Sequence, residues 1–96
     1  MDDAMNPTDT VQARPDVVSS ELGDGAALLD LNSSMYFSVN AVGACVWRAM
    51  ERPVTLTELA RIVSESFEIS PDDCQSDVAT LVSQLRRNGL VEVVDA

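Results

Sequence analysis

The stretch that decides the expected fold is Leu28-Leu29-Asp30-Leu31-Asn32-Ser33-Ser34-Met35-Tyr36-Phe37-Ser38-Val39-Asn40. Two runs have a period of two: Leu29 and Leu31 alternate with Leu28 and Asp30. In the second run, Met35, Phe37 and Val39 alternate with Ser34, Tyr36 and Ser38. This period is typical of strands that bury one face. Asn32-Ser33 lies between the two runs, and asparagine tolerates the positive φ of a tight hairpin turn. The stretch therefore predicts two strands joined by a two-residue hairpin.

A helix is predicted directly after the hairpin. Asn40 is a favourable helix cap, and the apolar period then changes to about 3.6 residues through residues 42–50. Gly43 lies inside this helix at a cost of roughly 1 kcal/mol relative to alanine. We expect a close approach of the sheet to explain it. Arg52-Pro53 ends the helix.

Two further helices are predicted by their capping residues. Thr55 and Glu58 form a capping-box pattern ahead of a helical apolar stripe. Ser70-Pro71 begins a third helix, and Gly89 is a suitable stop residue. The apolar stripe of this third helix contains Cys74, Val78, Leu81, Val82 and Leu85.

The chain before the hairpin divides into a tail and a first strand. Residues 1–15 are rich in Asp, Thr, Asn and Pro and are expected to form a disordered acidic tail. Residues 16–22 form a candidate strand before the turn Gly23-Asp24-Gly25, and residues 90–94 form a short final strand or pack on the core. The resulting order is a three-stranded antiparallel sheet followed by three helices, a winged-helix-like α+β domain over residues 16–96.

Chain length and net charge restrict the classes of function that this protein can have. The 96 residues suffice for one domain, and 16 acidic residues against 6 basic ones give a net charge of −10. A surface of this sign repels nucleic acid and anionic membranes, so DNA binding by the winged-helix shape is disfavoured. The sequence has neither a signal peptide nor an apolar run long enough to cross a membrane, and a soluble cytoplasmic protein is expected.

The residues for catalysis or metal binding are missing. There is no histidine, and two cysteines, Cys45 and Cys74, do not make a zinc-binding spacing. Both cysteines are interpreted as small buried apolar residues, with a disulfide left open. The pair Asp72-Asp73 is interpreted as capping charge. We therefore expect no enzyme, no metal and no cofactor, and a small acidic domain that binds peptides or proteins through an exposed sheet edge.

An ordered set of short motifs resembles the PqqD-like family. The runs are residues 25–31 (GAALLDL), residues 36–47 (YFSVNAVGACVW), residues 55–59 (TLTEL), and Asp77-Val78, Leu81, Leu85 and Gly89-Leu90-Val91. Together they extend over about residues 17–94. The resemblance implies a RiPP recognition element, a domain that binds the leader of a ribosomally made precursor peptide and delivers it to modifying enzymes.

The resemblance also implies a site. The leader would add as a strand beside the predicted third strand and lie against the third helix. Carried onto this sequence, the peptide-binding residues would be Ser34, Met35, Tyr36, Phe37, Ser38, Val39, Asp77, Val78, Leu81, Val82 and Leu85. Substituting Val82 or Leu81 with aspartate is expected to weaken leader binding. Tyr36 is interpreted as a wall of the leader pocket, and its alternative role is a packed aromatic ring.

Within the family, the pattern around residues 29–47 is most similar to the stand-alone proteins of lasso-peptide biosynthesis. The partners implied are a precursor leader peptide, a separate leader peptidase of the cysteine-protease type and a cyclase. The alternative is a peptide chaperone of pyrroloquinoline quinone biosynthesis that serves a radical enzyme. A winged-helix DNA-binding protein or a protein–protein adaptor ranks lower. The expected state is a monomer or a weak dimer that forms through the unpaired edge.

Overall fold

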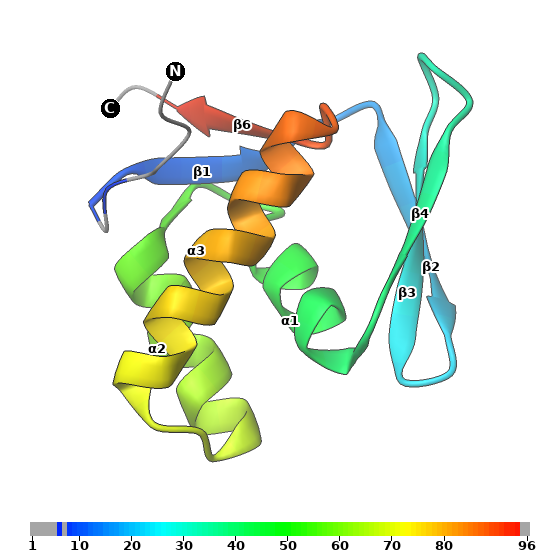
Figure 1. The fold of residues 1–96 in the computed structure, drawn as a ribbon. Helices are drawn as coiled ribbons and strands as arrows, with labels where there is room; N and C mark the ends of the chain where they lie inside the picture. The colour runs from blue at the N-terminus through cyan, green and yellow to red at the C-terminus, as the bar shows by residue number, and fades with distance from the viewer. Residues whose placement is uncertain (1–5, 7, 95–96) are drawn as a thin grey trace.

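The computed structural model describes residue 6 and residues 8–94 (Figure 1). The strands are β1 (Thr10–Ala13), β2 (Val17–Leu22), β3 (Gly25–Asp30), β4 (Tyr36–Val39), β5 (Val54–Thr55) and β6 (Val91–Val94). The helices are α1 (Ala41–Ala49), α2 (Leu56–Phe67) and α3 (Pro71–Arg87). The α+β prediction is confirmed, and most strands precede the helices.

The described strands form two antiparallel sheets rather than one. The first has the order β2-β3-β4 and consists of the three strands expected from the sequence. The second has the order β5-β1-β6, in which Val11 of β1 pairs with Val54 on one side and with Val93 on the other. Figure 1 shows β1 and β6 across the top of the helices and the β2-β3-β4 sheet beside them on the right.

The second sheet corrects the expected N-terminal tail. Thr10–Ala13 is a strand, and the Val11 side chain is fully buried. The polar composition of residues 1–15 hid this strand because Val11 is the one large apolar residue between Pro7 and Pro15. The expected tail is therefore wrong over β1, while residues 1–5 and 7 lie outside the described residues.

The helices begin where their caps predict. The Asn40 Oδ1 atom accepts a hydrogen bond from the Gly43 amide at 2.9 Å, and Thr55 Oγ1 accepts one from the Glu58 amide at 3.1 Å. Ser70 Oγ accepts from the Asp73 amide at 3.4 Å. The Glu58 carboxylate pairs with Arg61, which lowers its pKa chiefly through their hydrogen bond. α3 ends ahead of Gly89, whose φ of +79° suits glycine.

The hairpin turn differs from the expected two-residue form. Residues 31–35 join β3 to β4, and the positive φ of 62° falls on Ser34 rather than on Asn32. The Asp30 carboxylate accepts from the Asn32 amide at 3.0 Å, and the Ser33 hydroxyl accepts from the Met35 amide at 3.2 Å. These side-chain bonds to the backbone stabilise a wider loop.

Close contacts with Val39 explain why glycine occupies positions 25 and 43. A Cβ atom on Gly43 would lie 2.7 Å from the Val39 Cβ atom, and one on Gly25 would lie 2.0 Å from the Val39 carbonyl oxygen. Both separations are shorter than any Cβ contact that a folded protein accepts. The close approach expected at Gly43 is therefore made by the last residue of β4, and it fixes α1 against the sheet.

One apolar core connects both sheets to the helices. Leu28 of β3, Val46 and Trp47 of α1, Val63 of α2 and Val82 of α3 are all buried. Both cysteines are free; Cys74 is buried as expected, whereas Cys45 is partly exposed.

Candidate functional site: the free edge of β4

β4 is an edge strand, and part of its backbone N–H and C=O groups can pair with an added strand. The Asp30 amide donates to the Met35 carbonyl at 2.9 Å, so the backbone groups of Met35 point toward β3. Because these directions alternate along an antiparallel strand, Phe37 and Val39 also bond toward β3. The N–H and C=O groups of Tyr36 and Ser38 therefore point toward the free edge.

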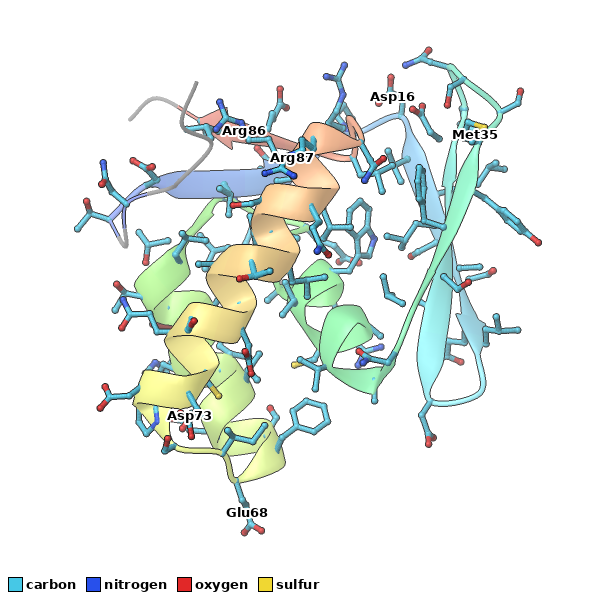
Figure 2. The ribbon with its side chains drawn as sticks, in the orientation of Figure 1. Asp16, Met35, Glu68, Asp73, Arg86 and Arg87 are labelled. Carbon is cyan, nitrogen blue, oxygen red and sulfur yellow. The ribbon has the colours of Figure 1, made fainter. Side chains whose placement is uncertain are left out.

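The side chains of β4 alternate between two faces of the sheet. Phe37 is the register partner of Leu28, and Val39 is the partner of Ala26. Leu28 and Ala26 are buried, so Phe37 and Val39 lie on the face that packs on the core, where both are partly buried. Met35 follows the same alternation before the strand begins, and its side chain is 57% exposed (Figure 2).

Tyr36 lies on the opposite face. Its register partner is Leu29, which in turn pairs with Val18, and the Tyr36 side chain is 71% exposed. Ser38 shares this outer face. The structure thus places Tyr36 on the face away from the helices, where its ring is not packed, and its role as a wall of the leader pocket stays a prediction.

The predicted α3 positions divide into core and surface. Val78, Val82 and Leu85 are at most 5% exposed and belong to the central core. Leu81 is partly buried against the edge of the core, and Asp77 is exposed. Of the five α3 residues, Leu81 and Asp77 are therefore the ones available to a ligand without unfolding.

α1 lies between β4 and α3. It contacts β3, β4 and α2, and Figure 1 shows it in the space between α3 and the β2-β3-β4 sheet. Val42 and Cys45 of α1 are partly buried apolar residues, as are Phe37 of β4 and Leu81 of α3. Three elements thus carry incompletely covered apolar side chains on this part of the molecule.

The charged residues in the segment that forms the β2-β3-β4 sheet are all acidic. Residues 16–40 contain Asp16, Glu21, Asp24 and Asp30 and no basic residue. On α3, Asp77 is exposed and helps burial to raise the pKa of the Cys74 thiol, burial being the larger cause. A peptide at the edge of β4 therefore meets an acidic surface, which favours a basic ligand.

Among residue 6 and residues 8–94, no group of three or more Cys, Asp or Glu side chains is placed to hold a metal ion. No described helix is both long and apolar enough to cross a membrane.

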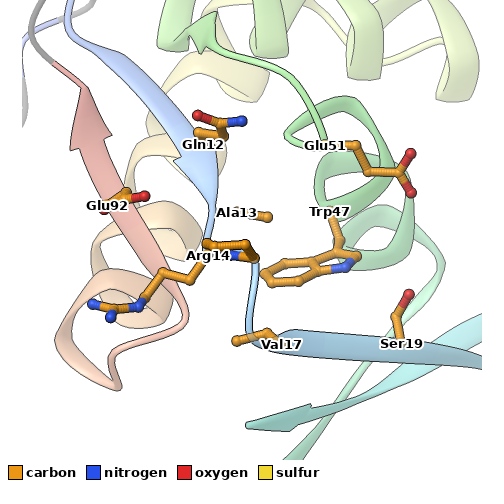
Figure 3. Close-up of a pocket in the computed structure, with 9 residues that line it drawn as sticks. Gln12, Ala13, Arg14, Val17, Ser19, Trp47, Glu51 and Glu92 are labelled. Carbon is orange, nitrogen blue, oxygen red and sulfur yellow. The ribbon is translucent and has the colours of Figure 1, made fainter. Parts of the chain in front are cut away.

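One cavity of the structure was not predicted from the sequence. Trp47 lines a cavity between the two sheets together with Ser19 and Glu51 (Figure 3). The signal for it was non-local, because these residues belong to different elements that meet only after folding.

The fold is shared with domains that have been solved with leader peptides. One is described as TbiB1 in complex with the TbiA(beta) leader peptide, with a TM-score of 0.77 and 22% identity over 88% of this chain and 99% of that chain. Another is a lasso peptide synthetase B1 complexed with the leader peptide, with a TM-score of 0.73 and 24% identity over 85% of this chain and 96% of that chain.

A third similar structure comes from Methylobacterium extorquens. It is the PqqD truncation of PqqCD, described as a stand-alone RiPP recognition element, with a TM-score of 0.77 and 15% identity over 93% of this chain and 95% of that chain. No curated protein matches the sequence. The family profile described as coenzyme PQQ synthesis protein D (PqqD) matches residues 25–91, well over half of the chain. The chain therefore belongs to the PqqD family.

Proposed function

We propose that this protein binds the leader region of a ribosomally synthesised precursor peptide by strand addition to β4, without catalysing a reaction itself. The observation that carries the proposal is the free edge of β4, where the backbone groups of Tyr36 and Ser38 point outward. Two proteins of the same fold are described as complexes with leader peptides, which supports the same role for this chain.

Main-chain hydrogen bonds at this edge would tolerate many leader sequences, and side chains would select among them. The partly covered Phe37 and Leu81 are the apolar contacts that we propose for leader side chains on the α3 side. Tyr36 would contact the side chains that the added strand turns to the outer face. The acidic residues around the sheet would favour a basic leader and make its association slower as salt increases.

The proposed pathway is lasso-peptide biosynthesis. In this role the protein would present the leader to a separate leader peptidase of the cysteine-protease type, ahead of a cyclase. The leader-bound lasso peptide synthetase B1 is 24% identical to this chain, and the PqqD truncation is 15% identical. This difference supports the lasso branch over a peptide chaperone for pyrroloquinoline quinone synthesis.

The binding test is an amide-shift NMR titration with synthetic leader peptides from precursor genes beside this protein's own gene. We expect saturable shifts in residues 34–39 and on the Asp77 and Leu81 side of α3. The variant Ser38→Pro removes an outward N–H from the β4 edge and should weaken binding at least about tenfold. Ser19→Pro makes the same change at the opposite edge of the sheet and serves as the control. Equal leader affinity of the two folded variants would refute strand addition at β4.

A second variant pair tests the α3 contact. Leu81→Asp places a charge among the proposed apolar contacts and should weaken leader binding several-fold in a folded protein. Thr80→Asp adds the same charge to the adjacent, exposed position and should bind nearly as the parent does. Normal binding by folded Leu81→Asp would remove α3 from the site.

Delivery requires its own measurement. Cleavage of the precursor by the neighbouring leader peptidase should accelerate when this protein is added, and Ser38→Pro should abolish the acceleration. If the peptidase is indifferent to the protein while leader binding is intact, the recipient enzyme is a different one, and the radical enzyme of the alternative pathway becomes the next to test.

A further inference from the structure

A cavity of about 350 Å³ lies where the chain passes from the second sheet to the first. Figure 3 shows Trp47 of α1 at its centre, with Gln12 of β1, Ser19 of β2 and Glu51 after α1 around it. This cavity adjoins β2, so it lies at the opposite edge of the β2-β3-β4 sheet from β4. Leader binding at β4 does not use it.

The indole of Trp47 is the unusual group in this cavity. The residue is only 3% exposed, and its N–H has no hydrogen-bond partner in the described part of the chain. The Trp47 nitrogen is not itself fully buried, because Asp16 Oδ1 is the one described side-chain polar atom that is fully buried and lacks a hydrogen-bond partner. Buried tryptophans usually find an acceptor for this group. In Figure 3 the nitrogen-bearing edge of the ring is turned toward Ser19 and Glu51.

The charged side chains around the cavity restrict which hydrogen-bond acceptor can bind beside the Trp47 N–H. Glu51 and Glu92 line the cavity together with Arg14, whose Nε atom is 3.7 Å from Asp16 Oδ1. The arginine is thus engaged with another carboxylate, and the cavity is acidic. A carboxylate or phosphate ligand is disfavoured there. The best match is a neutral group that accepts from the Trp47 N–H and donates to the Glu51 carboxylate, which a carboxamide does through two separate atoms.

The backbone of β2 indicates what carries this group. The Leu31 amide donates to the Asp16 carbonyl at 3.0 Å, so Asp16 bonds toward β3. By the alternation of an antiparallel pair, the N–H and C=O groups of Ser19 and Glu21 point toward the free edge of β2. Ser19 also lines the cavity. An extended peptide paired with this edge can therefore place a side chain beside Trp47.

We propose that the β2 edge and the Trp47 cavity form a second peptide site, which binds an extended segment with an asparagine or glutamine side chain in the cavity. This proposal is independent of leader binding at β4. The two sites lie at opposite edges of one sheet, so both can be occupied at once.

The test uses the tripeptide acetyl-Val-Gln-Val-methylamide and the full chain. Trp47 is the single tryptophan in the sequence, so its indole N–H gives one NMR signal that reports on the cavity alone. We expect this signal to shift and saturate with a dissociation constant on the order of 1 mM, as is reasonable for so small a ligand. Backbone shifts should fall on Ser19 and Glu21 and spare Tyr36 and Ser38.

Ligand controls define the chemistry. Replacing Gln in the tripeptide with Leu or Glu should weaken binding at least about fivefold, the effect of one lost hydrogen bond or of charge repulsion. If the Leu peptide binds as well as the Gln peptide, the cavity does not read a carboxamide and the proposal fails. A fourth peptide carries Thr in place of Gln. If it binds as tightly as the Gln peptide or more tightly, the cavity recognises a hydroxyl group and the proposed carboxamide site is wrong. Acetamide alone should bind far more weakly, and an equal shift with acetamide would overturn the role of the β2 edge.

Protein variants complete the test. Glu51→Gln changes an exposed side chain and should weaken Val-Gln-Val binding at least about fivefold, whereas Glu65→Gln, the same change on α2, should not. Trp47→Phe keeps the ring packing but removes the donor, and the backbone shifts of Ser19 report its binding. Ser19→Pro should weaken this tripeptide and spare the leader, and Ser38→Pro should do the reverse. An unaffected Glu51→Gln protein would refute the site.

Discussion

The two three-stranded sheets of this protein bury their surfaces very differently. The β5-β1-β6 sheet contributes Val11 and Val91 to the core, and both are at most 3% exposed. The β2-β3-β4 sheet buries Ala26 and Leu28 on one face and leaves Val18, Leu22 and Tyr36 exposed on the other. The β5-β1-β6 sheet therefore contributes mainly to the core, whereas the β2-β3-β4 sheet leaves one face accessible to other molecules.

The comparison also concerns how each sheet forms. β2, β3 and β4 are consecutive in the chain, and each pairs with its neighbour through a short connection. β1 instead pairs with β5 and β6, which come much later in the sequence. The β5-β1-β6 sheet therefore depends on the completed helical core, whereas the β2-β3-β4 sheet forms from local hairpins.

The largest expected difference in stability follows from placing an aspartate in the buried core and, for comparison, at an exposed position of the β2-β3-β4 sheet. Val82→Asp puts a carboxylate into the fully buried core and should cost roughly 4 kcal/mol or more, enough to unfold most of the protein at 25 °C. Leu22→Asp puts the same group on a side chain that is 61% exposed and should leave the protein folded. Circular dichroism melting distinguishes the two. A folded Val82→Asp protein would contradict the position of α3 in the core.

A matched pair of valines measures the difference between the sheets directly. Val11→Ala in β1 should lower the free energy of unfolding by about 2 kcal/mol, because it removes two methyl groups from the core. Val18→Ala in β2, where the side chain is 46% exposed, should cost about 0.5 kcal/mol or less. Urea titrations of both variants give these values. Equal losses would mean that β1 is not an integral part of the core.

The junction between the open sheet and α1 should give a smaller effect. Gly43→Ala gains helix propensity but brings a Cβ atom against Val39, so we expect a net loss of about 1 kcal/mol. Adding Val39→Gly removes the Cβ atom that the new methyl group meets and should reverse part of this loss, so the double-mutant cycle should show a coupling of the two sites. A stabilised Gly43→Ala protein would show that the sheet moves aside easily.

The smallest difference is one of reaction rate. Cys45 is partly exposed, whereas Cys74 is buried and burial raises the pKa of its thiol. Because the thiolate is the reactive form, Cys45 should react with iodoacetamide well before Cys74 at neutral pH. Mass spectrometry of peptides from a partly alkylated sample identifies the order. Faster labelling of Cys74 would indicate that α2 and α3 separate readily.

Local signals in the sequence predicted the open sheet and the helices well. Period-two alternation placed β3 and β4, and Asn40, Thr55 and Ser70 marked the helix starts where the structure has them. The β5-β1-β6 sheet was missed because its pairing is non-local and β1 is short, with Val11 as its one large apolar residue. The loop before β4 was also mispredicted, since side-chain bonds from Asp30 and Ser33 decide its shape.

The candidate site was predictable only in outline. Periodicity identified the apolar stripe of α3 but not how much of it the core covers, so the predicted peptide-binding residues included Val78, Val82 and Leu85, which are buried. The side of the sheet that Tyr36 occupies follows from its pairing with Leu29, and Leu29 is outward because Leu28 is buried. Such assignments require tertiary packing, which one sequence does not contain.

The pairing of β1 with β6 has a consequence for tethering. Thr10 is the register partner of Val94, so the polypeptide enters and leaves the domain at one place, at the far end of the molecule from β4 (Figure 1). The domain is 35 Å long. A protein fused before β1 or after β6 would therefore need a linker of about ten extended residues or more to reach a peptide held at β4. Shorter linkers would keep a fused enzyme away from that peptide.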